Sequence, residues 1–172
     1  MAGNQFIFAN SDIDGSLSYL FLRWITNAQI PYKTSSLFTI EQDFNDWYRK
    51  NGENYERVYL LGIDVTNCLN FVNKDNVIIF KHQLPVNKLT TAKIITDEKS
   101  NSTSMLLYNK FKKKVSLCDS QKLALLLVND IKKYTFELPQ SRDLDILYKA
   151  YTGDKLLKFT TDFNGGFTGF LD

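Results

Sequence analysis

Residues 6–24, FIFANSDIDGSLSYLFLRW, join a short apolar run to an amphipathic helix and place two aspartates at the junction. The apolar run, residues 5–9, is typical of a buried strand, and apolar residues from Leu17 to Trp24 recur at the spacing of one helix face. Asp12 and Asp14 therefore stand where a strand ends and a helix begins. A carboxylate at such a junction either caps the helix or holds a metal ion, and this stretch alone leaves both interpretations open.

The rest of the N-terminal half repeats the pattern of short apolar strands followed by helical spacing. We expect further strands over residues 32–38, 57–63, 76–80 and 92–96, and helices over residues 40–50 and 67–73. Apolar strands that alternate with helices predict an α/β fold, in which a parallel β-sheet carries helices on both faces.

The C-terminal part has helical spacing and no strand-like run. Helices are expected over residues 102–114, 120–134 and 144–151, before a tail that ends in DFNGGFTGFLD. The chain length fits one domain. We therefore interpret residues 1–172 as a single α/β domain, with a sheet core over about residues 5–97 and a helical closing segment over about residues 102–172.

Four side chains that can bind a metal follow the ends of expected strands. Asp12 and Asp14 follow the first strand, Asp64 follows the third, and His82 follows the fourth. Ligands in parallel α/β sheets bind outside the carboxyl ends of the strands, so we expect these four residues on one edge of the sheet. Three carboxylates and an imidazole can hold a divalent cation, which would activate water for phosphoester hydrolysis.

Each of these residues also has a structural interpretation. Asp14 precedes Gly15 and is a candidate N-cap of the first helix, and Asp64 is a candidate cap of the helix near residue 67. His82 can be an ordinary surface residue in a loop. The sequence leaves these alternatives open beside the metal site.

The composition narrows the class of protein and of site. The net charge is +2, so no strong global field favours nucleic acid or a membrane. His82 is the only histidine, which argues against a catalytic triad and a multi-histidine zinc site and leaves carboxylates that suit Mg²⁺ or Mn²⁺. No apolar run is long enough to span a bilayer, and no signal peptide is evident. Cys68 and Cys118 are interpreted as buried reduced thiols, which favours a cytoplasmic protein.

The motifs NSDIDG, GID and IIFKHQ follow successive strands in this order and resemble those of the DHH phosphoesterase family. That family includes RecJ-like nucleases, oligoribonucleases and cyclic-dinucleotide phosphodiesterases. Asp12 and Asp14 match its first motif, His-x-Asp-x-Asp-Gly; Asp64 matches its second, and His82 matches the central residue of its third, Asp-His-His. The resemblance implies that these four residues bind Mn²⁺ or Mg²⁺ and that Asp64 and His82 are catalytic. It extends over about residues 6–159, through TDEKSNSTSMLLYNKF and ELPQSRDLDILYKAYTGDKLLKF.

The sequence departs from the family pattern at several positions. Asn10 replaces the histidine of the first motif, and Lys81 and Gln83 replace the outer residues of the third. Asp130 is only an insecure match to the fourth acidic position of the family. A short, degenerate member that lacks the usual second domain is therefore expected, and the tail motif NGGFTG is at most a remnant of it.

Lys81 would act as a cation that replaces the metal. Its ammonium is attracted to the carboxylates that a metal would occupy, and each unit charge at ~4 Å contributes about 4 kcal/mol at an effective dielectric constant near 20. We therefore expect one weak metal site at most, and Lys81 held instead in a salt-bridge cluster with the aspartates.

Two functions follow from the sequence. The first is a degenerate DHH-like protein that is catalytically impaired and acts by binding a protein or a nucleic-acid or nucleotide partner. The alternative is an active Mn²⁺- or Mg²⁺-dependent phosphodiesterase that acts on nucleotides or short oligonucleotides. An unrelated α/β binding module remains a third interpretation.

A basic run near the end of an expected helix is a candidate contact for a partner. Lys110, Lys112, Lys113 and Lys114 form this run, which can contact nucleic acid or an acidic protein surface and can equally be a solvated helix end. The composition, rich in Asn, Lys, Phe and Tyr, suits a small viral or low-GC bacterial gene. A viral origin would place the protein in the host cytoplasm.

Overall fold

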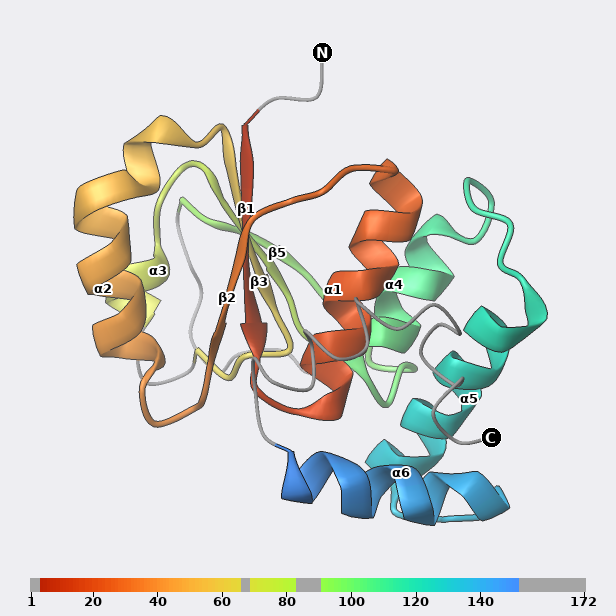
Figure 1. Cartoon of the computed structure of the whole chain (residues 1–172). Helices are drawn as coiled ribbons and strands as arrows, with labels where there is room; N and C mark the ends of the chain where they lie inside the picture. The colour runs from red at the N-terminus through yellow and green to blue at the C-terminus, as the bar shows by residue number, and fades with distance from the viewer. Residues whose placement is uncertain (1–3, 66–68, 83–90, 152–172) are drawn as a thin grey trace.

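A computed structural model describes residues 4–65, 69–82 and 91–151 and contains a five-stranded parallel sheet (Figure 1). The strands are β1 (Gln5–Asn10), β2 (Tyr32–Ser35), β3 (Arg57–Leu61), β4 (Val77–Phe80) and β5 (Lys93–Ile95). Their order is β2-β1-β3-β4-β5, and every pair of neighbours is parallel. The predicted α/β fold with a parallel sheet is confirmed.

Helices cover both faces of the sheet, as the apolar strands predict. They are α1 (Ile13–Thr26), α2 (Ile40–Asn51), α3 (Leu69–Val72), α4 (Thr103–Phe111), α5 (Asp119–Lys133) and α6 (Pro139–Ala150), with a short 3-10 turn at Gly52–Asn54. Side chains alternate along β1: Ile7 and Ala9 pack with α1, α4 and α5, whereas Phe6 and Phe8 pack with α2 on the opposite face.

The strand order places a topological switch point at the carboxyl ends of β1 and β3. The chain leaves β1 towards β2 on one side, and β3 lies on the other side of β1. Ligands in sheets of this order bind in the crevice at that point. Asp12 follows β1 and Asp64 follows β3, so the fold brings both to the switch point.

The strand expected over 57–63 ends at Leu61 and the helix expected over 102–114 ends at Phe111. Three further details also differ from the sequence expectations. The strand expected over 32–38 ends at Ser35, because the following residues form a turn in which the Thr39 hydroxyl accepts a hydrogen bond from the Ser36 amide at 3.2 Å. The last helix begins at Pro139, earlier than expected, since proline is favoured in the first helical turn. Cys118 is exposed and not buried, because it occupies the N-cap position of α5.

Part of the predicted closing segment, residues 152–172, lies outside the described residues, as do Cys68 and Gln83. Among the helices that are described, none has both the length and the apolar character needed to cross a bilayer.

Candidate functional site

Asp12 joins the start of α1 to the end of α5. Its Oδ1 accepts a hydrogen bond from the Gly15 amide at 2.8 Å, so Asp12 is the N-cap of α1 and Asp14 is not. Its Oδ2 lies 3.1 Å from the Lys132 ammonium. Burial opposes it, but the Asp12 and Asp14 carboxylates raise the pKa of Lys132, so this lysine stays charged beside Asp12.

Gly15 allows the first turn of α1 to lie directly against the end of β1. A Cβ atom at Gly15 would come within 2.1 Å of the backbone oxygen of Asn10. The glycine of the NSDIDG motif therefore fixes the close approach of helix and strand that brings Asp12 and Asp14 to the edge of the sheet.

Asp14 is 2% exposed and binds the N-terminus of α4. Its carboxylate accepts hydrogen bonds from the Thr103 amide at 2.7 Å, the Ser104 amide at 2.9 Å and the Ser104 hydroxyl at 2.7 Å. Burial and the Asp12 carboxylate raise the pKa of Asp14, whereas the hydrogen bonds from Ser104 and Thr103 lower it. Both oxygens of this carboxylate therefore face donors of the protein itself.

Lys81 forms an ion pair with Asp64. The Lys81 ammonium lies 2.7 Å from Asp64 Oδ1, and the lysine side chain is 10% exposed whereas the aspartate side chain is 48% exposed. The backbone of Lys81 continues the β4–β5 ladder by donating to the Ile95 oxygen at 3.2 Å. Strand pairing thus fixes the point from which the ammonium reaches Asp64.

His82 is half-buried next to the same groups. Burial lowers the pKa of His82, as do the charges of Lys132 and Lys81, while Asp14 and Asp12 oppose the change. The ring is therefore neutral at pH 7. Its Nδ1 has no hydrogen-bond partner among the described residues.

Helix α6 lies across the end of the sheet to which the β1 arrow points (Figure 1). From this helix the buried Tyr148 hydroxyl faces Ser16 of α1 and lies in the field of Asp12. Burial raises the pKa of Tyr148, so the hydroxyl stays protonated. Helix α6 therefore covers the start of α1.

The carboxylates, as they are placed, do not fit a divalent metal. Each of the three has a donor or a cation from the chain at hydrogen-bond distance: Lys132 for Asp12, the start of α4 for Asp14, and Lys81 for Asp64. Within the described part of the chain, no group of three or more His, Cys, Asp or Glu side chains is placed to hold an ion. A metal would have to displace both ammonium groups from their carboxylates.

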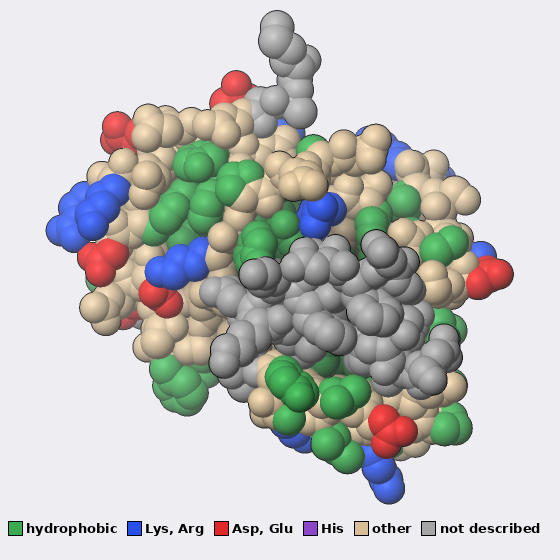
Figure 2. Space-filling view, in the orientation of Figure 1, with side chains coloured by type: hydrophobic (Ala, Val, Ile, Leu, Met, Phe, Trp, Pro, Cys, Tyr) green, Lys and Arg blue, Asp and Glu red, His purple; other side chains and the backbone are tan. Residues whose placement is uncertain are grey.

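The predicted lysine run lies away from this edge. Lys110, Lys112, Lys113 and Lys114 are exposed at the end of α4, whereas the start of α4 contacts Asp14. Nine helical residues span about 13 Å. On the face drawn in Figure 2, basic and acidic side chains are interspersed over the described residues. The lysine that does reach the edge is Lys132, at the end of α5.

Asp130 has a structural role in the turn between α5 and α6. It is 6% exposed and accepts hydrogen bonds from the Glu137 and Leu138 amides at 3.1 and 2.9 Å, and also from the Thr135 and Ser141 hydroxyls. Burial would raise the pKa of Asp130, but these four hydrogen bonds hold it well below its usual range. Its carboxylate is thus engaged by the turn.

Solved structures with a similar fold include DHH-family phosphoesterases. The pGpG-specific phosphodiesterase PggH from Vibrio cholerae matches 79% of this chain at a TM-score of 0.50 and 14% identity. The exonuclease RecJ bound to manganese matches 96% at 0.51 and 15% identity. CDC45 from Entamoeba histolytica matches 86% at 0.50 and 13% identity.

At these identities the likeness shows the fold alone, and it is the fold that suggests the DHH family. This chain spans 39%, 48% and 34% of the lengths of the PggH, RecJ and CDC45 chains, respectively. No family model matches the sequence, and no curated protein matches it.

Proposed function

We propose that this chain is a DHH-like protein that is catalytically impaired and acts by binding a protein or nucleic-acid partner. One observation carries the proposal: Asp12, Asp14 and Asp64, the three carboxylates that match the family motifs, are each engaged by groups of the chain itself. Lys81 and Lys132 supply two positive charges where a metal ion would supply them.

The energetics support a substitution of lysine for metal. A metal site needs an excess of negative ligands to offset the dehydration of the ion. The Coulomb attraction between an ammonium and a carboxylate at ~4 Å is about 4 kcal/mol at an effective dielectric constant near 20, and desolvation and solvent screening of these partly exposed pairs reduce the net contribution to about 1 kcal/mol. Binding of a divalent ion would break the attraction between each ammonium and its carboxylate. The ion would also be repelled by the Lys81 ammonium, which is nearly buried and cannot turn freely into solvent.

The test is calorimetric titration of metal-stripped protein with Mn²⁺, alongside hydrolysis assays with pGpG and short oligonucleotides. We expect no binding below millimolar Mn²⁺ and no hydrolysis. Lys81→Asp is the matched positive control, because it removes the ammonium and restores a carboxylate at that position, so its Mn²⁺ affinity should rise. Micromolar binding by the unaltered protein that Asp12→Asn abolishes, together with hydrolysis, would overturn the proposal.

The second candidate is an active Mn²⁺- or Mg²⁺-dependent phosphodiesterase that acts on nucleotides or short oligonucleotides. Two observations favour this candidate. Asp12, Asp64 and His82 lie around the switch point of the sheet, and RecJ, whose fold is similar, was solved bound to manganese. Asp64 and His82 would then be the catalytic pair. The same titration decides between the two candidates, because this one requires Mn²⁺ or Mg²⁺ to compete with Lys81.

A further inference from the structure

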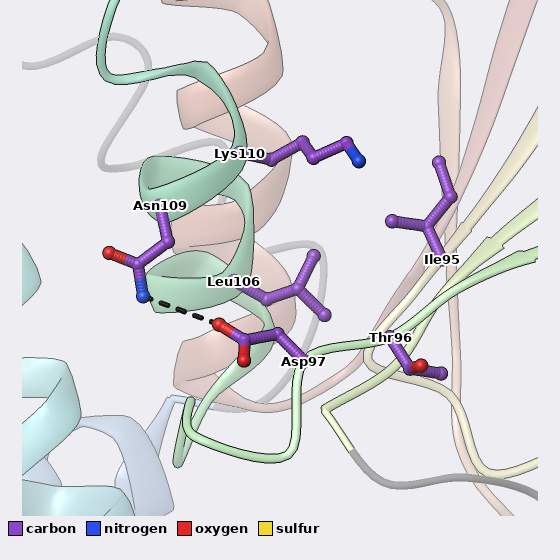
Figure 3. Close-up of a pocket in the computed structure, with 6 residues that line it drawn as sticks. All are labelled: Ile95, Thr96, Asp97, Leu106, Asn109 and Lys110. Atoms are coloured by element: carbon purple, nitrogen blue, oxygen red, sulfur yellow. Dashed lines mark hydrogen bonds between the residues drawn. The ribbon is translucent and has the colours of Figure 1, made fainter.

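A pocket of about 240 Å³ opens between β5 and α4 (Figure 3). Ile95 and Leu106 supply its apolar walls, and Lys110 reaches across it from α4 towards Ile95. The remaining lining residues are Thr96, Asp97 and Asn109. The pocket is separate from the edge that carries Asp12 and Asp64, and the proposed function makes no use of it.

The pocket lies beside an unpaired edge of the sheet. In the described part of the chain, β5 is the last strand and pairs only with β4. The Ile95 oxygen accepts from the Lys81 amide, so the peptide groups of Ile95 face β4. Because successive residues of a strand direct their peptide groups to opposite sides, those of Ile94 face outward and can pair with another strand.

The charges around the pocket are unequal at its two ends. At one end the Asp97 carboxylate accepts from the Ser100 hydroxyl at 2.6 Å and from the Lys99 amide at 3.1 Å, so its charge is already engaged. At the other end lies Lys110, one helical turn beyond Leu106.

Lys93 lies at that same end. It shares a strand face with Ile95, two residues away, and α4 runs opposite to β5 because its start is held at the carboxyl edge by Asp14. Both Lys93 and Lys110 are exposed, and neither forms an ion pair with the carboxylates of the described segments. Within the described part of the chain, this end therefore offers two ammonium groups that form no ion pair.

We propose that this edge binds an extended acidic peptide of a partner protein by strand addition. The peptide pairs with the outward peptide groups of Ile94 and places an apolar side chain between Ile95 and Leu106. An acidic side chain two residues further on the same face then meets Lys93 and Lys110. This inference names a partner class for the binding role proposed above.

A peptide fits these features better than a nucleic acid does. Strand addition uses main-chain donors and acceptors for affinity and side-chain pockets for specificity, and an exposed sheet edge beside a pocket supplies both. Lysine on an edge strand also disfavours pairing with neutral strands of other copies. An acidic strand would convert that same charge into attraction.

The probe is a fluorescein-labelled peptide, Asp-Thr-Val-Thr-Asp-Thr-Val-Thr-Asp, whose strand face alternates aspartate and valine in either direction. Binding is measured by fluorescence anisotropy on the full chain at low salt. We expect Lys110→Glu and the pocket-filling Thr96→Trp each to weaken binding by about tenfold or more. Lys50→Glu, the same charge change on exposed α2, should leave binding unchanged.

Two further controls address the mode of binding. A peptide N-methylated at both its threonines and its valines should not bind, because one set of these N–H groups faces β5 in antiparallel pairing and the other in parallel pairing. The amide of Ile94 should exchange more slowly with solvent when the unmodified peptide is bound. The inference is overturned by absence of binding at millimolar peptide, by equal binding of the N-methylated peptide, by unchanged affinity of both variants, or by an oligothymidylate that displaces the peptide and binds more tightly. Mn²⁺ titration of the same preparations reports on the proposed function separately, so either can fail alone.

Discussion

The role of Asp14 can be tested by the sign of a stability change. If this carboxylate anchors α4, its replacement by alanine should destabilise the protein. If it were instead held ready as a metal ligand, its removal from the metal-free protein would relieve repulsion with Asp12 and stabilise the fold. The two interpretations therefore predict opposite signs for Asp14→Ala in the presence of a chelator.

The magnitude follows from the three hydrogen bonds that Asp14 accepts. Alanine would leave the Thr103 amide, the Ser104 amide and the Ser104 hydroxyl without their acceptor in a site that is 2% exposed. Each buried donor left unsatisfied costs roughly 1–3 kcal/mol. Relief of the buried charge, whose pKa is raised by burial and by Asp12, offsets part of this cost. We expect a net loss of about 3 kcal/mol in the free energy of unfolding.

Denaturant and thermal unfolding in EDTA measure the effect. For a chain of this size a loss of about 3 kcal/mol lowers the melting temperature by roughly 6–12 °C. Ser104→Ala, which removes one of the three donors with its hydroxyl, should cost about 1 kcal/mol. Asp119→Ala, a first-turn aspartate that is fully exposed, is the matched control and should change little. An Asp14→Ala protein as stable as the parent, or more stable, would refute the anchoring role.

Three further predictions concern other parts of the fold. Gly15→Ala should prevent soluble expression or lower the melting temperature strongly, because the new Cβ would overlap the backbone of β1. The control is Ser18→Ala, which removes a buried hydroxyl without a partner among the described residues and should be neutral or stabilising in the same expression and melting assays. A double-mutant cycle with Asp12→Asn and Lys132→Met should give a coupling of about 1 kcal/mol that falls with added salt, and zero coupling would mean that the pair does not stabilise the fold. The pKa of Asp130 is lower in the folded than in the unfolded chain, so the Asp130 carboxylate contributes its full stabilisation above its unfolded pKa and loses it as the pH falls below that pKa. The unfolding free energy of Asp130→Asn should therefore fall less steeply than that of the parent on acidification below about pH 4. Parallel pH profiles of the two proteins would contradict this role of Asp130.

The sheet was predictable because its signals are local. Phe6 and Phe8 lie on one face of β1, and Ile7 and Ala9 lie on the other, so both faces of the strand are apolar. Residues 5–9 are therefore predicted as a strand that is covered on both sides. The carboxyl-edge position of Asp12 and Asp64 follows from strand ends alone, since all strands are parallel. The charge of Lys81 predicts a salt-bridge cluster with the three aspartates. Among the described residues Lys81 instead forms an ion pair with Asp64, while Lys132 binds Asp12 and the start of α4 binds Asp14.

The partners of Asp12 and Asp14 could not be predicted in this way. Lys132 lies 120 residues from Asp12, and Thr103 lies 89 residues from Asp14. No periodicity in either segment signals such a contact, because it depends on how α4 and α5 dock over α1. Asp130 carried a local signal, since its partners lie within 11 residues along the chain.

The link between Asp14 and α4 also orders events during synthesis. Its two ends are 89 residues apart, and at roughly 5–20 residues per second a ribosome needs between about 4 and 18 seconds to pass from one to the other. Throughout that interval the carboxylate of Asp14 has no helix to cap and stays hydrated. The edge of the sheet is therefore completed late, after β5 has been made, and a nascent chain presents to its surroundings an acidic site that the finished protein keeps closed.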